Sequence, residues 1–310
     1  MQALAIPILI LVAAAALAFA IRRRSPSTAL LSAVLALGWF GIVMLQGGTM
    51  LAASIGLAAL LPFVARGLGN QATLLRFAMF AVAFVLFALT HADRLVSLPD
   101  IALMAVIGLG MLAFVLRSPE TDRVPGIEAA HLCVVALGIA AIAIDMQRDG
   151  AALSLPAMLA GAMAGCLLAN RPVGSSTLGF PTADAAALLV ALLLGDLALS
   201  GGWWAALVLG AIAALEISIL LATAARADRS NDKDRARGVY VEAIARGRGE
   251  RKALIGTLVV GAILIVLALG ASMDEWIAAL LGAGALMWMF QRYLWRLVPE
   301  RRPHRGTGAN

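Results

Sequence analysis

The sequence is poor in charged residues. Asp, Glu, Lys and Arg make up 14% of its 310 residues, whereas 62% of the residues are hydrophobic. A soluble domain of this length has about a quarter of its residues charged and about half of them apolar. The composition therefore excludes an ordinary soluble protein and indicates an integral membrane protein, in agreement with the mean hydropathy of +0.94.

Cysteine is also scarce, and no acidic residue precedes Asp93. Cys133 and Cys166 both fall within apolar runs, so we expect neither a disulfide nor a metal site built on thiols. The first apolar run has no basic residue before it and is followed by Arg22, Arg23 and Arg24. We therefore expect this run to remain as a membrane helix and not to be removed as a signal peptide.

Apolar runs of about 20 residues recur along the chain, and each is long enough to cross a hydrocarbon core of about 30 Å. Isolated strands would leave backbone groups unpaired in lipid, so each run is expected to be a helix. The sequence thus predicts an all-α polytopic membrane protein, a single integral membrane domain over residues 1–310 with about eleven transmembrane helices. The predicted spans are 2–20, 28–46, 49–65, 72–90, 99–117, 127–145, 153–169, 182–200, 203–224, 253–271 and 275–292.

Basic residues are distributed asymmetrically between the predicted loops. With the N-terminus outside, only Arg94 and Arg148 of the 24 Lys and Arg residues lie outside, which leaves 22 in cytoplasmic segments. Short cytoplasmic loops carry excess positive charge, so the pattern predicts this orientation and a cytoplasmic C-terminus. A basic loop over 226–252 and a basic tail over 293–310 would face anionic lipid headgroups; we expect no nucleic acid partner.

Several polar residues fall in or beside the cytoplasmic third of the predicted spans. They are Asp122, Glu128, His131, Asn170, Asp184 and Glu216. An ionisable group in hydrocarbon indicates a partner, a cavity or a function, and Glu216 is the deepest. Glu128 and His131 share one helical face. Two interpretations remain open: satisfied polar contacts and helix caps, or a cation- or phosphate-binding cleft open to the cytosol. Asp145 and Asp196 lie near outer ends and are interpreted as structural.

Three segments in the second half of the chain match known sequence motifs. In LLANRPVGSSTLGFPTA, over Leu167–Ala183, the residues Asn170, Pro172 and Gly179 match the run N-x-P-P-A-x-x-F-M-G-D-x-G-S. Glu216 lies ten residues before Arg226, which matches a second motif, a helix with an acidic residue ahead of arginines. Residues 235–256 align with a third motif, a D-R-x-H-x-H-H loop. On these motifs the region 122–271 resembles the polyprenyl-phosphate N-acetylhexosamine-1-phosphate transferases.

This resemblance implies an enzyme scaffold that moves a sugar phosphate from a UDP-sugar to a lipid phosphate. It also implies eleven spans, Mg²⁺ as cofactor, a role in cell-envelope polysaccharide synthesis and the bacterial inner (cytoplasmic) membrane. A homodimer or an envelope-enzyme partner would fit the same role. The candidate substrate- and phosphate-binding residues are Asn170, Arg171, Arg226, Arg229, Arg235 and Arg237. For each arginine, attraction to the inner leaflet is the simpler interpretation.

The chain departs from the family at the residues that carry the chemistry. Phe180 replaces the aspartate after the glycine, and Gly238, Tyr240 and Val241 replace the histidine cluster. The paired aspartates near the third and fourth spans are missing. Phosphoryl transfer between two anionic substrates relies on Mg²⁺ held by carboxylates. We therefore expect a degenerate member that keeps the scaffold, with weak or no catalysis.

Two alternatives remain. In the first, a divergent but active transferase uses Asp122, Glu128, Asp184 and Glu216 as catalytic residues, with Glu216 and Asp184 as the magnesium ligands if a metal is bound at all. In the second, the chain is a lipid or solute transporter. Against the transporter, no pair of Pro- or Gly-interrupted helices meets at the predicted midplane.

Overall fold

A computed structural model describes residues 72–94, 97–121, 126–148, 150–169, 182–230 and 250–297, together with Val124 and Leu178. The predicted spans 2–20, 28–46 and 49–65 lie outside these residues, as do most of the basic loop and of the basic tail.

Every regular element in the described ranges is helical, as the sequence predicts. The helices are α4 (Ala72–Thr90), α5 (Leu98–Thr121), α6 (Ile127–Asp145), α7 (Ala151–Ala169), α8 (Thr182–Leu197), α9 (Trp203–Leu209), α10 (Ala211–Ser230), α12 (Glu250–Ser272) and α13 (Trp276–Leu297), with a short 3-10 turn η2 (Ala92–Arg94) and a π turn η3 (Ala198–Gly202). Five helical segments among these residues are long and apolar enough to cross a membrane. They are Asp100–Ser118, Ile127–Asp145, Ala183–Leu209, Arg251–Ser272 and Trp276–Leu294, and three shorter apolar helices accompany them. The chain is therefore a helical membrane protein, whereas the count of eleven spans and their orientation stay predictions.

Most helices coincide with the apolar runs, although α5 and α13 extend four and five residues beyond the predicted ends at 117 and 292. One predicted span is divided. The sequence predicts a single helix over 203–224, but the structure divides it at Gly210 into α9 and α10, and α10 continues to Ser230. The sequence predicts that Arg226 and Arg229 lie in the basic loop. In the structure their backbone is instead part of helix α10. Between α8 and α9 the chain bends at Gly201, whose φ of 99° is readily adopted only by glycine.

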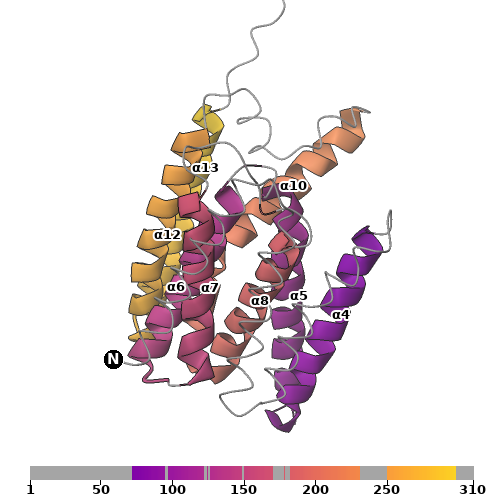
Figure 1. Ribbon diagram of the computed structural model, residues 1–310, viewed down its shortest axis with the longest axis vertical. Helices are drawn as coiled ribbons and strands as arrows, with labels where there is room; N and C mark the ends of the chain where they lie inside the picture. Colours follow the sequence, from indigo (N-terminus) through magenta and orange to yellow (C-terminus); the bar gives the residue numbers. More distant parts are fainter. Residues whose placement is uncertain are drawn as a thin grey trace, which may run out of the picture.

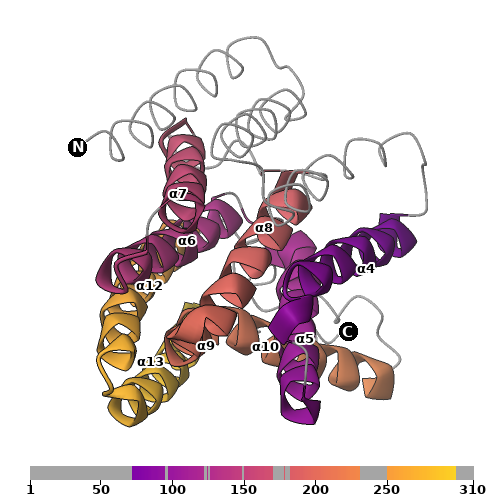
Figure 2. The same cartoon turned by 90° about the horizontal axis from the view of Figure 1, so that it is seen from below.

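Helix α6 lies between α7 and α12 (Figure 2). Two glycines allow α6 and α12 to approach closely. A Cβ placed on Gly261 of α12 would lie 3.0 Å from the Cβ of Val134 in α6. One turn further along both helices, a Cβ on Gly138 of α6 would lie 3.1 Å from Cδ1 of Leu209 in α9 and 3.3 Å from Cγ1 of Ile265 in α12. Each helix therefore offers a glycine to a branched side chain of the other, a small-residue contact typical of membrane bundles.

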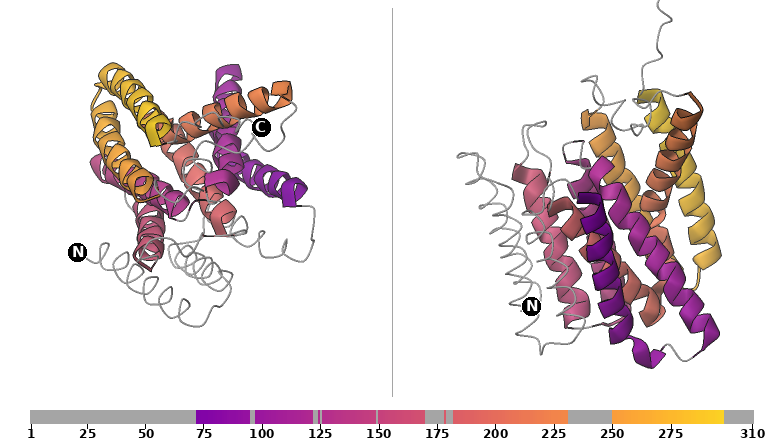
Figure 3. Two further views of the ribbon diagram at one scale, coloured as in Figure 1. Left: turned by 90° about the horizontal axis from the view of Figure 1, so that it is seen from above. Right: turned by 90° about the vertical axis from the view of Figure 1, so that its right-hand side faces the viewer.

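Polar contacts gather at two opposite ends of the bundle. The α4–α5, α6–α7 and α12–α13 connections lie at the lower end in Figure 1, which we call the His91 end. There the rings of Trp204 and Trp276 stack, with centroids 4.4 Å apart. The opposite end, the Arg117 end, holds the α5–α6 connection and is where α10 crosses α5 (Figure 3). The sequence predicts that the Arg117 end faces the cytoplasm.

Candidate functional site

A fully buried arginine, Arg117 of α5, lies at the centre of the Arg117 end. Its Nη1 donates to Oε2 of Glu216 in α10. The same nitrogen lies 3.2 Å from Oε2 of Glu128 in α6, and Nη2 lies 3.5 Å from the other oxygen of Glu128. One guanidinium thus joins two buried carboxylates from two other helices, which the planar fork of arginine suits better than the point charge of lysine.

Two rings complete this group. His131 lies one turn after Glu128 on α6, and its Nδ1 is 3.6 Å from Oε2 of Glu216. The ring of Phe114, one turn before Arg117, has its centroid 4.4 Å from the guanidinium carbon and 5.7 Å from that of the His131 ring. We call Arg117, Glu128, His131 and Glu216 the Arg117 cluster. Within the described part of the chain, Oε1 of Glu216 and both ring nitrogens of His131 have no hydrogen-bond partner.

The Arg117 cluster provides the partner that the buried charge of Glu216 requires. Charged side chains within membrane spans pair with one another, because an isolated charge in hydrocarbon is costly. Glu128 and Glu216 meet as the sequence suggests, but they meet around a cation that belongs to the protein. Among the residues with described positions, no three His, Cys, Asp or Glu side chains could hold a metal ion together. In the structure, the carboxylates of Glu128 and Glu216 both contact Arg117.

The other candidates lie elsewhere. Asp184 is buried in the first turn of α8, a helix that contributes no residue to the Arg117 cluster. Arg226 and Arg229 lie on the last turns of α10, where only the backbone is described. Asp122, Asn170, Arg171, Arg235 and Arg237 fall outside the described residues.

Arg117 is the residue that the sequence interpretation misses, because the charge pattern groups it with the cytoplasmic loop charges. The structure extends α5 to Thr121, so Arg117 is within the helix and not at its end. The sequence nevertheless contains a feature that identifies Arg117 as a partner. Two glutamates in apolar helices require a nearby positive charge, and Arg117 directly follows an apolar run next to the span that carries Glu128.

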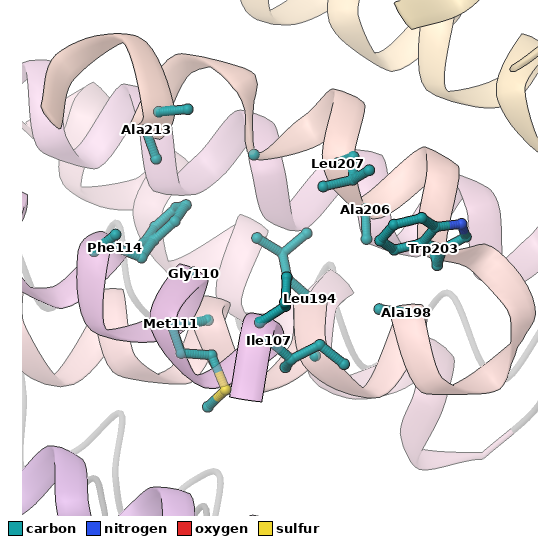
Figure 4. Close-up of a pocket in the computed structure, with 16 residues that line it drawn as sticks. Ile107, Gly110, Met111, Phe114, Leu194, Ala198, Trp203, Ala206, Leu207 and Ala213 are labelled. Atoms are coloured by element: carbon teal, nitrogen blue, oxygen red, sulfur yellow. The ribbon is translucent and has the colours of Figure 1, made fainter. Parts of the chain in front are cut away.

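An apolar groove lies next to the Arg117 cluster, between α5, α8, α9 and α10. It has a volume of about 220 Å³ and is lined only by Ala, Gly, Val, Ile, Leu, Met, Phe and Trp (Figure 4). Val106 of α5 and Leu207 of α9 line the groove and are 55% and 42% exposed, so the groove opens on the side of the bundle.

The groove runs from Trp203 at the His91 end toward Phe114 at the Arg117 end (Figure 4). Phe114 lines the groove, and its ring also packs against the guanidinium of Arg117. Ala213 of α10 also lines it, one turn before Glu216. The ion pair between Arg117 and Glu216 therefore joins the two helices α5 and α10 one turn beyond this end of the groove.

No protein-family model matches the chain, and neither the curated proteins nor the solved structures contain one with significant similarity to it.

Proposed function

We propose that this protein binds the hydrocarbon chain of a polyprenyl phosphate in the groove between α5 and α8–α10, without transferring sugar phosphate to it. In this proposal the chain keeps the scaffold of a UDP-sugar:polyprenyl-phosphate transferase and serves envelope polysaccharide synthesis as a lipid-binding partner of active enzymes. The observation that carries the proposal is the lateral, wholly apolar groove.

The shape of the groove supports a chain-like ligand. Its lining on α5 extends from Val106 to Phe114, which corresponds to about 12 Å of helix at 1.5 Å per residue. Nine of its sixteen lining residues are alanine or glycine, so short side chains form much of the wall. In a bilayer, lipid tails are as apolar as the groove, so selection must come from close packing against these walls and not from exclusion of water.

The charges support the loss of catalysis. Transfer of a phosphoryl group requires carboxylates that can hold Mg²⁺. Glu128 and Glu216 instead bind Arg117, and Phe180 stands where the resemblance expects an aspartate.

One experiment tests both parts of the proposal. The purified full-length protein in nanodiscs is incubated with a polyprenyl phosphate, Mg²⁺ and a panel of UDP-sugars. We expect the lipid to remain bound in native mass spectrometry and no UMP to be released. Release of UMP that disappears in Glu216→Ala would establish an active transferase, and substrate-dependent flux in proteoliposomes would establish a transporter.

Filling the groove should weaken this binding. Gly110 lines the groove, and a Cβ added to it would have no atom within 4 Å, so Gly110→Phe places a ring in the groove without a backbone clash. Losing about ten carbon contacts, each worth about 0.1–0.2 kcal/mol, predicts roughly tenfold weaker binding. The measurement is competition between a polyprenyl phosphate and bulk phospholipid.

Gly284→Phe is the matched control for this variant. Gly284 lies on the exposed face of α13 and likewise has nothing within 4 Å, but it is not part of the groove. Equal affinity of both variants for the lipid would show that the groove is not the binding site.

A further inference from the structure

A second polar group lies at the His91 end, where α4, the α6–α7 turn and α8 meet. Asp196 of α8 accepts a hydrogen bond at 2.9 Å from Nη2 of Arg148, which follows α6. Its other oxygen, Oδ1, lies 3.6 Å from Nε2 of His91 at the end of α4. The side chains of His91, Asp196 and Arg148 are only 10%, 14% and 22% exposed, so water screens their charges incompletely.

The neighbours of the His91 ring favour a proton on Nδ1. Nδ1 lies 3.0 Å from the carbonyl oxygen of Phe87 and 3.0 Å from Oγ1 of Thr90. The Thr90 hydroxyl donates its proton to the same carbonyl at 2.6 Å. Both neighbours therefore present lone pairs to Nδ1, and only an Nδ1–H group can satisfy them.

With the proton on Nδ1, the neutral ring bears a lone pair on Nε2, and that lone pair faces Oδ1 of the Asp196 carboxylate. A second proton on Nε2 replaces this repulsion with an attraction between imidazolium and carboxylate. It also places a positive charge over the Phe87 ring, whose centroid is 4.7 Å away. Two further charges lie on the adjoining elements: Arg148, which donates to Oδ2 of Asp196, and the exposed Asp93 of η2.

The same region holds a close contact between α4 and α8. Phe87 of α4 is fully buried, and a Cβ on Gly195 of α8 would lie 2.9 Å from its Cζ. Gly195 immediately precedes Asp196. Among the described helices, α4 packs mainly against α5 and α8, and much of its surface is exposed. An added attraction between His91 and Asp196 therefore acts directly at a contact between α4 and α8.

We propose that His91 is a proton-binding site at the His91 end of the bundle, and that the bound proton tightens the contact between α4 and α8. If this end faces outward, as the charge pattern predicts, the protein responds to the pH outside the cell. The inference does not depend on lipid binding in the groove.

The chain contains only three histidines, which makes nitrogen NMR of histidine-labelled protein a direct test. His304→Gln and His91→Gln assign the signals. We expect the Nδ1–H tautomer for neutral His91 in the otherwise unchanged protein. Asp196→Asn should lower the pH at which His91 titrates by about one pH unit, because an opposite charge at this range shifts a titration by that much or more. An Nε2–H tautomer for neutral His91, or a titration that Asp196→Asn leaves unchanged, would overturn the proposal.

Thermal unfolding tests whether the proton bound to His91 tightens the contact between α4 and α8. Protonated His91 is favoured by the folded state, so its stabilisation is present at low pH and is lost as the pH rises through the His91 titration. Relative to His91→Gln, the unchanged protein should gain about 2–4 °C in unfolding midpoint between pH 8 and pH 5.5. His304→Gln, which removes a different histidine, should retain the full gain. A difference between the unchanged protein and His91→Gln that does not vary with pH would show that the proton does not act on the fold.

Discussion

Replacing Arg117 with methionine should destabilise the protein by about 3–5 kcal/mol, the cost of leaving buried charges without their partner. The substitution keeps most of the side-chain volume and the contact with Phe114, but it leaves Glu128 and Glu216 in apolar surroundings without the guanidinium that both now contact. The free energy of unfolding in mixed micelles measures this loss.

Two further variants separate charge from packing. Arg117→Lys keeps the charge, but a single ammonium cannot span both carboxylates and stack on Phe114, so we expect a loss between that of methionine and zero. The triple variant Arg117→Met, Glu128→Gln, Glu216→Gln removes every charge of the ion-paired group and should recover most of the stability lost by Arg117→Met. If the triple variant were as unstable as the single one, packing of Arg117 and not its charge would be the stabilising feature.

The second large effect is expected at the contact between α6 and α12. A methyl group on Gly261 would meet both Cγ atoms of Val134 and come within 3.0 Å of its Cβ. Valine in a helix has one strongly preferred rotamer, so Val134 cannot turn away and α12 must shift. Gly261→Ala should therefore lower the free energy of unfolding by about 1–3 kcal/mol, as overpacking does elsewhere, and Gly261→Leu should lower it more.

Gly284→Ala is the control for this substitution. It makes the same chemical change within α13, at an exposed position where a Cβ meets nothing within 4 Å. Because alanine is favoured over glycine in a helix by about 1 kcal/mol, this variant should be as stable as the unchanged protein or slightly more stable. Equal losses at both positions would mean that the approach of α6 and α12 is not as close as the structure has it.

Gly261 and Arg117 are coupled through helix α6. Val134 lies one turn after His131 on α6, so a shift of α6 at the contact with α12 would also move Glu128 and His131. A shift of α12 at Gly261 should therefore also disturb the Arg117 cluster. Combining Gly261→Ala with Arg117→Met should then cost less than the sum of the two single losses.

The sequence by itself determined that this is a helical membrane protein and where most of its described helices begin and end. The apolar run 127–145 coincides with α6 and the run 72–90 with α4. Such agreement is expected, because in lipid a chain must satisfy its backbone groups within each helix, and that requirement is local in sequence. The sequence also indicated that Glu128 and Glu216 need partners.

Only the tertiary structure decided which residue pairs with Glu128 and Glu216. Arg117 and Glu216 are 99 residues apart, and their contact depends on how α5, α6 and α10 are rotated about their axes. The sequence likewise indicated a structural role for Asp196 but not its pairing with Arg148 and His91. Hydropathy fixes how long a helix is, but close contacts such as Gly261 with Val134 fix which face it turns inward. These contacts join residues distant in sequence, so no local pattern in the chain contains them.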